Sequence, residues 1–349
     1  MKSTNSLQPD LEYILENTRG LWDELRGRRV FITGGTGFFG CWLLESFLWA
    51  NRELGLGASV TVLTRDAATF RARVPHLALD SALTLHPGDV RSFDYPAGAF
   101  THVIHAATAA SAALNGDDPL TMLDTIVDGT RRVLDFSVLH GARKFLLTSS
   151  GAVYGKQPVS LSHTPETYAG VPDTMDPQSA YAEGKRLSEL LCAIYAGKHG
   201  METKIARGFA FIGPWLPLDR HFAAGNFIRD RLRGGPIEVQ GDGTTVRSYL
   251  YAADLAIWLW TILLKGRSCR PYNVGSDQAV AISELASMIS GLESPVAVRI
   301  ASKPRPGALP DRYVPDIARA RTELNLRPLT SLTDAVRRTA EWAAERVLV

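Results

Sequence analysis

Short runs of β-branched and apolar residues alternate with longer amphipathic stretches from residue 28 onward. This rhythm is typical of parallel strands joined by helices that cover both faces of a sheet. We expect strands at residues 30–33, 60–64, 83–86, 102–105, 144–148, 204–207 and 272–274. The pattern therefore predicts an α/β protein with a doubly wound parallel sheet, whose ligand lies where the strands end.

The regular alternation stops after residue 207. A stretch rich in glycine and proline follows, FAFIGPWLPLDRHFAAGNF, and a proline-rich run, KPRPGALPDRYVP, interrupts the chain again before two final helical patterns. Such breaks favour a second, smaller lobe. The most apolar stretch, 250–264, contains Asp254 and is shorter than a membrane span, so we expect a buried helix there.

Composition excludes several classes of function. Charged residues make up 21% of the 349-residue chain and the formal net charge is +2, so bulk charge indicates no nucleic-acid and no membrane partner. Cys41, Cys192 and Cys269 lack the spacing of a metal site, and we expect no metal. The N-terminal residues lack the layout of a signal peptide, which together with the scattered cysteines favours the cytoplasm.

A glycine-rich turn separates the first predicted strand from an apolar helix, in the run VFITGGTGFFGCWLL. A pyrophosphate needs backbone N–H groups at a helix N-terminus, and side chains on these glycines would block its approach. Glycines at this spacing also occur by chance in tight turns, but the flanking strand and helix favour a Rossmann-type dinucleotide site. We expect the cofactor to contact Gly34, Thr36, Gly37, Phe38, Phe39 and Gly40.

The ends of the next strands supply further candidate contacts. Thr64 and Arg65 offer a hydroxyl and a guanidinium, which suit the 2′-phosphate of NADP better than the free ribose hydroxyl of NAD. Asp66 is close, so a shift of one residue would reverse this preference. Asp89 and Val90 are placed to meet the adenine ring, unless they only form a loop turn.

After the fourth strand, His105, Ala106 and Ala107 let the backbone lie against the cofactor. The alanines leave room for this approach. We interpret His105 itself as a packed histidine rather than as a catalyst.

A serine-rich strand end and a helix carry the candidate catalytic groups. KFLLTSSGAVYG contains Ser150, and SAYAEGKRLSELL follows with Tyr181 and Lys185 four residues apart, on one helix face. A tyrosine with a pKa near ~10 is a poor base at neutral pH, but a nearby ammonium stabilises the phenolate and lowers that pKa. Such a pair alone is more often an exposed helix face. Its position after the glycine turn and the serine-rich strand favours catalysis.

Together these motifs resemble those of extended short-chain dehydrogenases/reductases of the NAD(P)-dependent nucleotide-sugar epimerase/dehydratase family. TGGTGFFG, TSSGAVYG, YAEGK and VRSYLYAADLA match family motifs in the family order, and the resemblance covers residues 28–342. It implies that Ser150 hydrogen-bonds the reacting sugar oxygen, Tyr181 exchanges the proton and Lys185 tunes the tyrosine. It also implies that a smaller lobe grips a nucleoside-diphosphate sugar through Asn226, Arg247, Arg305 and Tyr313.

We therefore expect an N-terminal helical extension over 1–27, a Rossmann dinucleotide-binding domain over 28–207 with 248–275, and a substrate-binding lobe over 208–247 and 276–349. Arg247 is the strongest substrate-side candidate because a guanidinium binds two oxygens of a diphosphate at once. A salt bridge to Asp254 is the alternative. The resemblance also suggests a homodimer built on the helix of Tyr181 and on residues 120–140. The apolar residues on that helix, Leu187, Leu190, Leu191 and Ile194, fit the protein's own sheet equally well.

The expected reaction rests on two small residues. Relatives that dehydrate or decarboxylate the sugar carry an acid at one or both of the positions held here by Gly151 and Ala152. The sequence therefore predicts a 4-epimerase that oxidises the sugar at C4 and returns the hydride to the opposite face. The alternatives are an NADPH-dependent reductase of a nucleotide keto-sugar, a dehydratase or decarboxylase, and a non-catalytic protein that senses NADP. Ile126 and Ala210 replace asparagines of the family motifs, which indicates an unusual sugar or pose.

Overall fold

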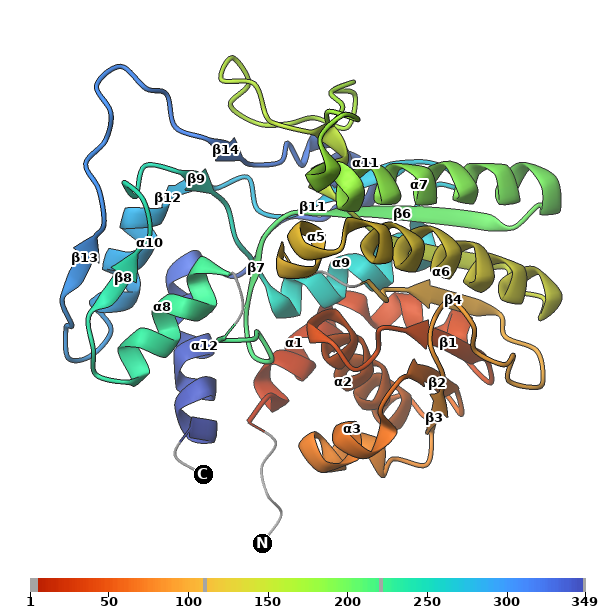
Figure 1. Cartoon of the computed structure of the whole chain (residues 1–349). Coiled ribbons are helices and arrows are strands. Elements are labelled where there is room, and N and C mark those ends of the chain that lie inside the picture. Colours follow the sequence, from red (N-terminus) through yellow and green to blue (C-terminus); the bar gives the residue numbers. More distant parts are fainter. Residues whose placement is uncertain (1–5, 109–111, 220–221, 348–349) are drawn as a thin grey trace, which may run out of the picture. The chain divides into compact units, whose positions relative to one another are not determined.

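The computed structural model describes residues 6–108, 112–219 and 222–347. The chain forms two compact units (Figure 1). The first comprises Met1–Val153, Pro172–Arg207 and Ala256–Tyr272, and the second comprises Tyr154–Val171, Gly208–Leu255 and Asn273–Val349. The domain boundaries expected from the sequence remain a prediction.

A seven-stranded sheet runs through the first unit in the order β11-β6-β5-β4-β1-β2-β3. Its strands are β1 (Arg29–Thr33), β2 (Ser59–Thr64), β3 (Leu83–Pro87), β4 (His102–His105), β5 (Lys144–Ser150), β6 (Glu202–Gly208) and β11 (Pro271–Val274). Parallel pairs join β1 to β2 and β4, β2 to β3, and β4 to β5. The predicted Rossmann-type sheet is confirmed, and its order reverses between β1 and β4, where such sheets bind their ligands.

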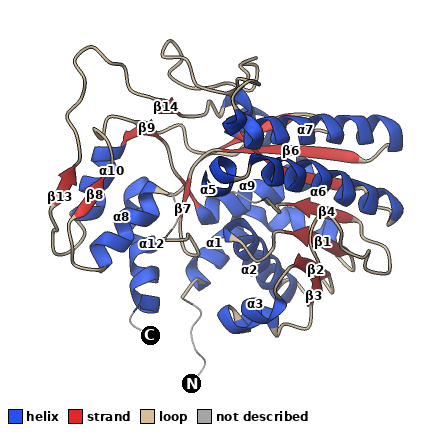
Figure 2. Ribbon diagram, in the orientation of Figure 1, coloured by secondary structure: helices blue, strands red, loops and turns tan. Residues whose placement is uncertain are grey.

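Two groups of helices cover this sheet (Figure 2). On one side α6 (Pro119–Leu139) and α7 (Ala180–His199) pack together, and their buried side chains share a core with Phe31 and Phe145. On the other side Trp260 of α9 (Ala252–Lys265) donates through Nε1 to Ser46 Oγ of α2 (Phe38–Glu53), at 2.9 Å. The buried helix predicted over 250–264 is thus confirmed. Within the described ranges, no helix is both long and apolar enough to cross a membrane.

Shorter elements complete the first unit. They are α1 (Gln8–Thr18), η1 (Arg19–Leu25), α3 (Ala67–Arg73), α4 (Pro75–Ala78), α5 (Ala112–Asp117), η2 (Gly151–Tyr154) and η3 (Pro177–Ser179). The N-terminal pair α1 and η1 packs into the core of this unit. The ring of Trp22 is fully buried and its centroid lies 4.9 Å from that of Trp260.

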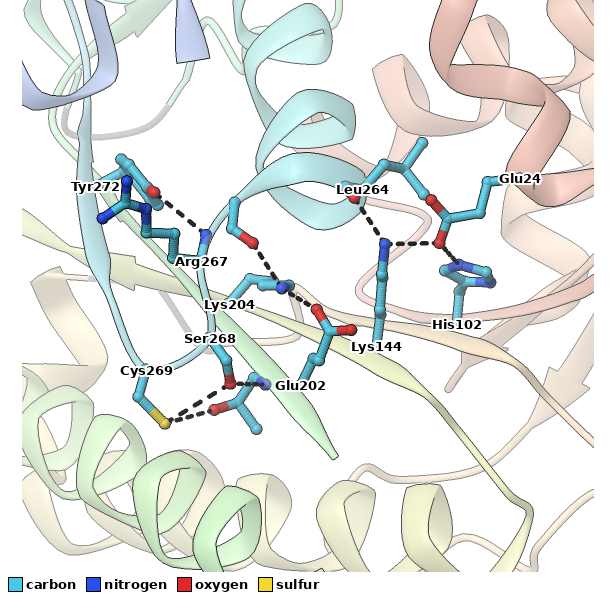
Figure 3. A network of polar contacts seen from close by, with 12 residues as sticks. Glu24, His102, Lys144, Glu202, Lys204, Leu264, Arg267, Ser268, Cys269 and Tyr272 are labelled. Atoms are coloured by element: carbon cyan, nitrogen blue, oxygen red, sulfur yellow. Dashed lines mark hydrogen bonds and ion pairs between the residues drawn. The ribbon is translucent and has the colours of Figure 1, made fainter. Parts of the chain in front are cut away.

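A network of polar contacts lies where β4, β5 and β6 begin (Figure 3). Lys144 Nζ donates to the Leu264 carbonyl at 2.6 Å and lies 2.6 Å from Glu24 Oε1 of η1. Lys204 Nζ donates to the Gly266 carbonyl at 2.6 Å. Ammonium groups at a helix C-terminus satisfy its free carbonyls and match its dipole. The two lysines therefore cap α9 at the edge of the sheet opposite to the carboxyl ends of the strands.

The second unit combines short strands with helices. The strands are β7 (Phe211–Ile212), β8 (Ile237–Val239), β9 (Val246–Arg247), β10 (Leu250–Tyr251), β12 (Val280–Ala281), β13 (Val298–Ile300) and β14 (Arg312–Tyr313). The helices are α8 (Ala223–Leu232), α10 (Ile282–Ser290), α11 (Ala318–Leu324) and α12 (Leu332–Val347). The strands pair as β10-β7, β12-β9-β14 and β13-β8.

Candidate active site

The glycine turn after β1 is built by close backbone contacts. Gly34 has φ +71°, and a Cβ there would lie 2.5 Å from the backbone of Ala106 at the end of β4. A Cβ on Gly40 would lie 2.3 Å from the Gly34 carbonyl oxygen. A Cβ on Gly37, which caps α2, would meet only that oxygen, at 3.5 Å. Gly34 and Gly40 therefore shape the turn, whereas Gly37 leaves its surface open.

The end of β4 meets this turn through hydrogen bonds. The Ala107 amide donates to Thr33 Oγ1 at 3.1 Å, and His105 Nδ1 lies 2.7 Å from the same hydroxyl. The other ring nitrogen of His105 lies 3.1 Å from Thr130 Oγ1. Burial, with a smaller contribution from the charge of Lys185, lowers the pKa of His105 to about 3. His105 is therefore a neutral, packed histidine, as predicted.

Arg65 and Asp66 follow the end of β2, and both are exposed. The strand ends at Thr64, and Asp66 caps α3 by accepting from the Thr69 amide at 2.9 Å and from Thr69 Oγ1 at 2.6 Å. These bonds occupy both carboxylate oxygens of Asp66 and lower its pKa. Arg65 is exposed, and its guanidinium as a ligand contact stays a prediction.

Asp89, expected to meet adenine, has a partner in the protein. Its carboxylate accepts from the Arg91 side chain at 2.9 Å and 3.3 Å, and these bonds lower the pKa of Asp89. An adenine amino group would have to share this carboxylate with Arg91. Val90 is buried against Gly129 of α6, where a Cβ would approach its side chain to 2.9 Å.

The three predicted catalytic side chains come together. Ser150 ends β5, where its hydroxyl accepts from the Ala152 amide at 3.1 Å. Tyr181 lies in the first turn of α7, close enough to Ser150 for that hydroxyl to lower the pKa of its phenol. Lys185 is 2% exposed and lies one turn further along, with Nζ 5.9 Å from the centre of the Tyr181 ring. Lys185 Nζ donates to the Thr148 carbonyl at 2.9 Å. A hydroxyl, a phenol and an ammonium thus converge at the end of β5.

The electrostatics of this group differ from the expectation. Desolvation raises the pKa of Tyr181, and the hydrogen bond from Ser150 only partly offsets it. Desolvation also lowers the pKa of Lys185 to about 8. In the protein alone burial therefore outweighs the other influences on the Tyr181 pKa, and the Lys185 ammonium bonds to Thr148. The expected role of Lys185 in stabilising the phenolate stays a prediction. The positive charge of an oxidised nicotinamide would favour the phenolate further.

The start of α7 is held by polar and apolar contacts. Asn115 Oδ1 accepts from the Tyr181 amide at 3.0 Å, and Asn115 Nδ2 donates to the Gln178 carbonyl at 2.6 Å. Ile126 is 2% exposed, and a Cβ on Gly184 would lie 3.2 Å from its side chain. Ile126 therefore supports the catalytic helix by packing, where the family motif has an asparagine.

Sequence reasoning missed a charged group beside the catalytic residues. Glu189 Oε1 accepts from Ser149 Oγ at 2.5 Å, and both Glu189 oxygens bind Arg207 of β6, at 2.9 Å and 2.6 Å. The spacing along α7 could have identified Glu189, because it lies four residues after Lys185 and eight after Tyr181, on the same helix face. Arg207 carried no local signal, since it is far away in sequence.

In the second unit, two of the predicted substrate residues lie next to each other on paired strands. Arg247 of β9 is paired with Tyr313 of β14, with its guanidinium carbon 5.9 Å from the tyrosine ring centre. The other two lie in different contacts. Asn226 Oδ1 accepts from Arg229 at 3.2 Å within α8, and Arg305 is exposed, with its charge close to Asp242.

The apolar side chains of α7 divide between core and surface. Leu191 is 6% exposed and belongs to the core, whereas Leu187, Leu190 and Ile194 are 40%, 54% and 50% exposed. The homodimer stays a prediction. Among the residues with described positions, no group of three or more His, Cys, Asp or Glu side chains could hold a metal ion.

Comparisons with known proteins converge on one family. Residues 30–275 match the model of the NAD-dependent epimerase/dehydratase family. The chain is 32% identical over 321 residues to UDP-glucuronic acid decarboxylase 1 of Arabidopsis thaliana, covering 92% of this chain and 71% of the relative. It is 30% identical over 337 residues to UDP-glucuronic acid decarboxylase 6 of the same plant, covering 96% and 93%.

Solved structures share the fold. The dTDP-glucose 4,6-dehydratase of Streptomyces venezuelae, solved with NAD bound, aligns with a TM-score of 0.77 and 25% identity, over 91% of this chain and 97% of that one. The UDP-glucuronic acid 4-epimerase of Bacillus cereus, solved with UDP-glucuronic acid and NAD, aligns with a TM-score of 0.75 and 22% identity, over 91% and 99%.

Proposed function

This chain belongs to the NAD-dependent epimerase/dehydratase family, and we propose that it oxidises a nucleoside-diphosphate sugar at C4. The observation that carries the proposal is the convergence of Ser150, Tyr181 and the buried Lys185 at the end of β5, with Lys185 Nζ 5.9 Å from the centre of the Tyr181 ring. Ser150 would hold the C4 oxygen while the Tyr181 phenolate takes its proton. A bound nicotinamide would supply the acceptor for the hydride that leaves C4. Lys185 would stabilise the phenolate, because opposite charges nearby favour the ionised form.

We propose a nucleoside-diphosphate uronic acid as the substrate and decarboxylation as the outcome. The support is the similarity to UDP-glucuronic acid decarboxylases along 92% of the chain. Oxidation at C4 makes the C6 carboxylate of such a sugar a β-keto acid, which can lose carbon dioxide without a base removing a proton. The enolate that remains then takes a proton at C5, and return of the hydride to C4 gives the pentose. The proposal departs from the expectation based on Gly151 and Ala152, where decarboxylating relatives carry an acid, because the loss of carbon dioxide itself needs no side-chain base, whereas dehydration needs an added base and acid.

The predicted 4-epimerase is the second candidate. The same Gly151 and Ala152 favour it, because epimerisation needs no acid or base beyond those that move the C4 proton. Both reactions begin with the same oxidation, so one assay separates them. The similarity to decarboxylases ranks the predicted 4-epimerase second.

The test is to incubate the purified protein with UDP-glucuronic acid and follow the sugar by NMR. We expect a nucleoside-diphosphate pentose and one carbon dioxide per turnover, without net consumption of cofactor. A 4-epimer of the uronic acid would select the second candidate, and steady consumption of added NADPH with a keto-sugar would select a reductase. If no nucleotide sugar turns over faster with the wild-type protein than with Tyr181→Phe, the proposed function is wrong.

We also propose that the enzyme prefers NADP to NAD. The support is the exposed Arg65 after β2, together with the engagement of Asp66 as a helix cap. Arg73 adds a second guanidinium nearby, since it donates to the Thr36 carbonyl of the glycine turn. A 2′-phosphate would gain charge-assisted hydrogen bonds from such guanidinium groups.

Arg65→Ala is expected to weaken binding of NADPH by about 10- to 100-fold, the effect of losing one hydrogen bond to a charged group. NADH, which lacks the 2′-phosphate, should bind almost as before. Calorimetric titration of both cofactors measures the difference. Arg71→Ala is the control, because Arg71 is an exposed arginine of the helix α3, which follows Arg65 in the chain. Equal losses for NADPH and NADH would contradict the preference.

A further inference from the structure

Three consecutive residues at the end of β5 each face one residue of α7. The Thr148 carbonyl accepts from Lys185, and Ser149 Oγ donates to Glu189. Ser150 lies close enough to Tyr181 to lower the pKa of the phenol. The helix residues are four apart, so they share one face along α7. Glu189 is therefore the third of three α7 residues that face the end of β5. The other two are the candidate catalytic residues Tyr181 and Lys185.

Glu189 is largely enclosed, with 12% of its side chain exposed. Arg207 binds both of its oxygens, which compensates the charge in a poorly solvated position. Its negative charge opposes the effect of burial on Lys185 and raises the pKa of that ammonium, which burial alone would lower further. Glu189 thus acts on Lys185 through space and on Ser149 through a hydrogen bond.

Apart from Arg207, which brings a positive charge to Glu189, the other titratable groups around Lys185 carry little charge. His105 from β4 is neutral near neutral pH because burial lowers its pKa to about 3. Burial also raises the pKa of the Cys192 thiol on α7, so the thiol stays protonated. Tyr181 is a neutral phenol in the protein alone. Among these groups Glu189 is the one that supplies a negative charge to Lys185.

We propose that Glu189 is a positioning residue of the active site, which keeps Lys185 protonated and, through Ser149, holds the Ser150 hydroxyl against Tyr181. This inference rests on the proposed acid/base role of Tyr181. It predicts two separable effects. The charge of Glu189 sets the pH range in which Lys185 supports the phenolate, and its hydrogen bond sets the geometry of Ser150.

The first test is a titration of Lys185 in the full-length protein carrying lysine labelled with carbon-13 at Cε, read by NMR, with the signal assigned by Lys185→Met. For the wild-type protein we expect a pKa of about 8. Glu189→Gln should lower it by about one unit, the size of effect that a neighbouring opposite charge has. Glu183→Gln is the matched control, because Glu183 lies on the same helix and pairs with Arg186 at 3.4 Å. If Lys185 titrates at the same pH in Glu189→Gln and Glu183→Gln, Glu189 does not act on Lys185 through its charge.

The second test concerns geometry and activity. Ser149→Ala removes the contact to Glu189 but keeps its charge, so turnover should fall about tenfold, the effect of one lost hydrogen bond, while Lys185 titrates as in the wild type. In Glu189→Gln the alkaline limb of the pH profile of kcat should move to lower pH by about one unit. Full turnover by Ser149→Ala would overturn the positioning role. The titration needs no substrate, so it stands even if the proposed reaction is wrong.

Discussion

Tyr181→Phe is expected to lower turnover by about 100- to 10,000-fold, the range for loss of a positioned acid/base group. The phenol is the group next to Ser150 that can accept the proton of the C4 hydroxyl as the hydride leaves. Phenylalanine keeps the ring in α7 and removes only the hydroxyl. Single-turnover reduction of bound cofactor by the sugar nucleotide measures the step directly.

Binding of the cofactor separates this result from a folding defect. Tyr181→Phe should bind NAD(P) with nearly the wild-type affinity and unfold at nearly the wild-type temperature, because the glycine turn is unchanged. Retention of more than about a tenth of the wild-type turnover would contradict the assignment of Tyr181 as the acid/base group.

Two glycines of the same turn are expected to respond differently to alanine. In Gly40→Ala the new methyl group would lie 2.3 Å from the Gly34 carbonyl oxygen, so the backbone has to move. We expect a loss of roughly 3 kcal/mol or more in the free energy of unfolding, the upper end for overpacking. In Gly37→Ala the methyl group meets only a contact at 3.5 Å, so the stability should hardly change.

Gly37→Ala should instead weaken binding of NAD(P) by about 100-fold, because its methyl group would separate the pyrophosphate from the backbone N–H groups of α2. Thermal unfolding without ligand and calorimetric titration with NADPH distinguish the two variants. A stable Gly37→Ala protein with unchanged affinity would mean that the dinucleotide does not lie on this turn.

The sheet could be predicted because its strands are short apolar runs bounded by turns and buried on both faces. The strand expected at 144–148, for example, is observed as Lys144–Ser150. The strands of the second unit were harder to predict from the sequence. Strands of two residues, such as Val246–Arg247, are too short to show any periodicity, and their pairing depends on partners far away in sequence.

The candidate site was predictable where its residues lie close together within one helix, as Tyr181 and Lys185 do. It was not predictable where side chains meet across the fold. Arg207 of β6 reaches Glu189 of α7, and Asp66 caps α3 by accepting from Thr69. The direction of the Tyr181 pKa also depends on desolvation, which the sequence does not reveal.

The lysine cap on α9 has a practical consequence for shortened versions of this enzyme. The family match begins at residue 30, so a truncation designed from it would discard η1 and with it Glu24 and Trp22. Lys144 would then keep a largely enclosed ammonium, 14% exposed, without its carboxylate, and Trp260 would lose an aromatic neighbour. Protein produced for crystallography or for screening should therefore retain this leading segment, or it risks aggregation through the uncovered tryptophan surface.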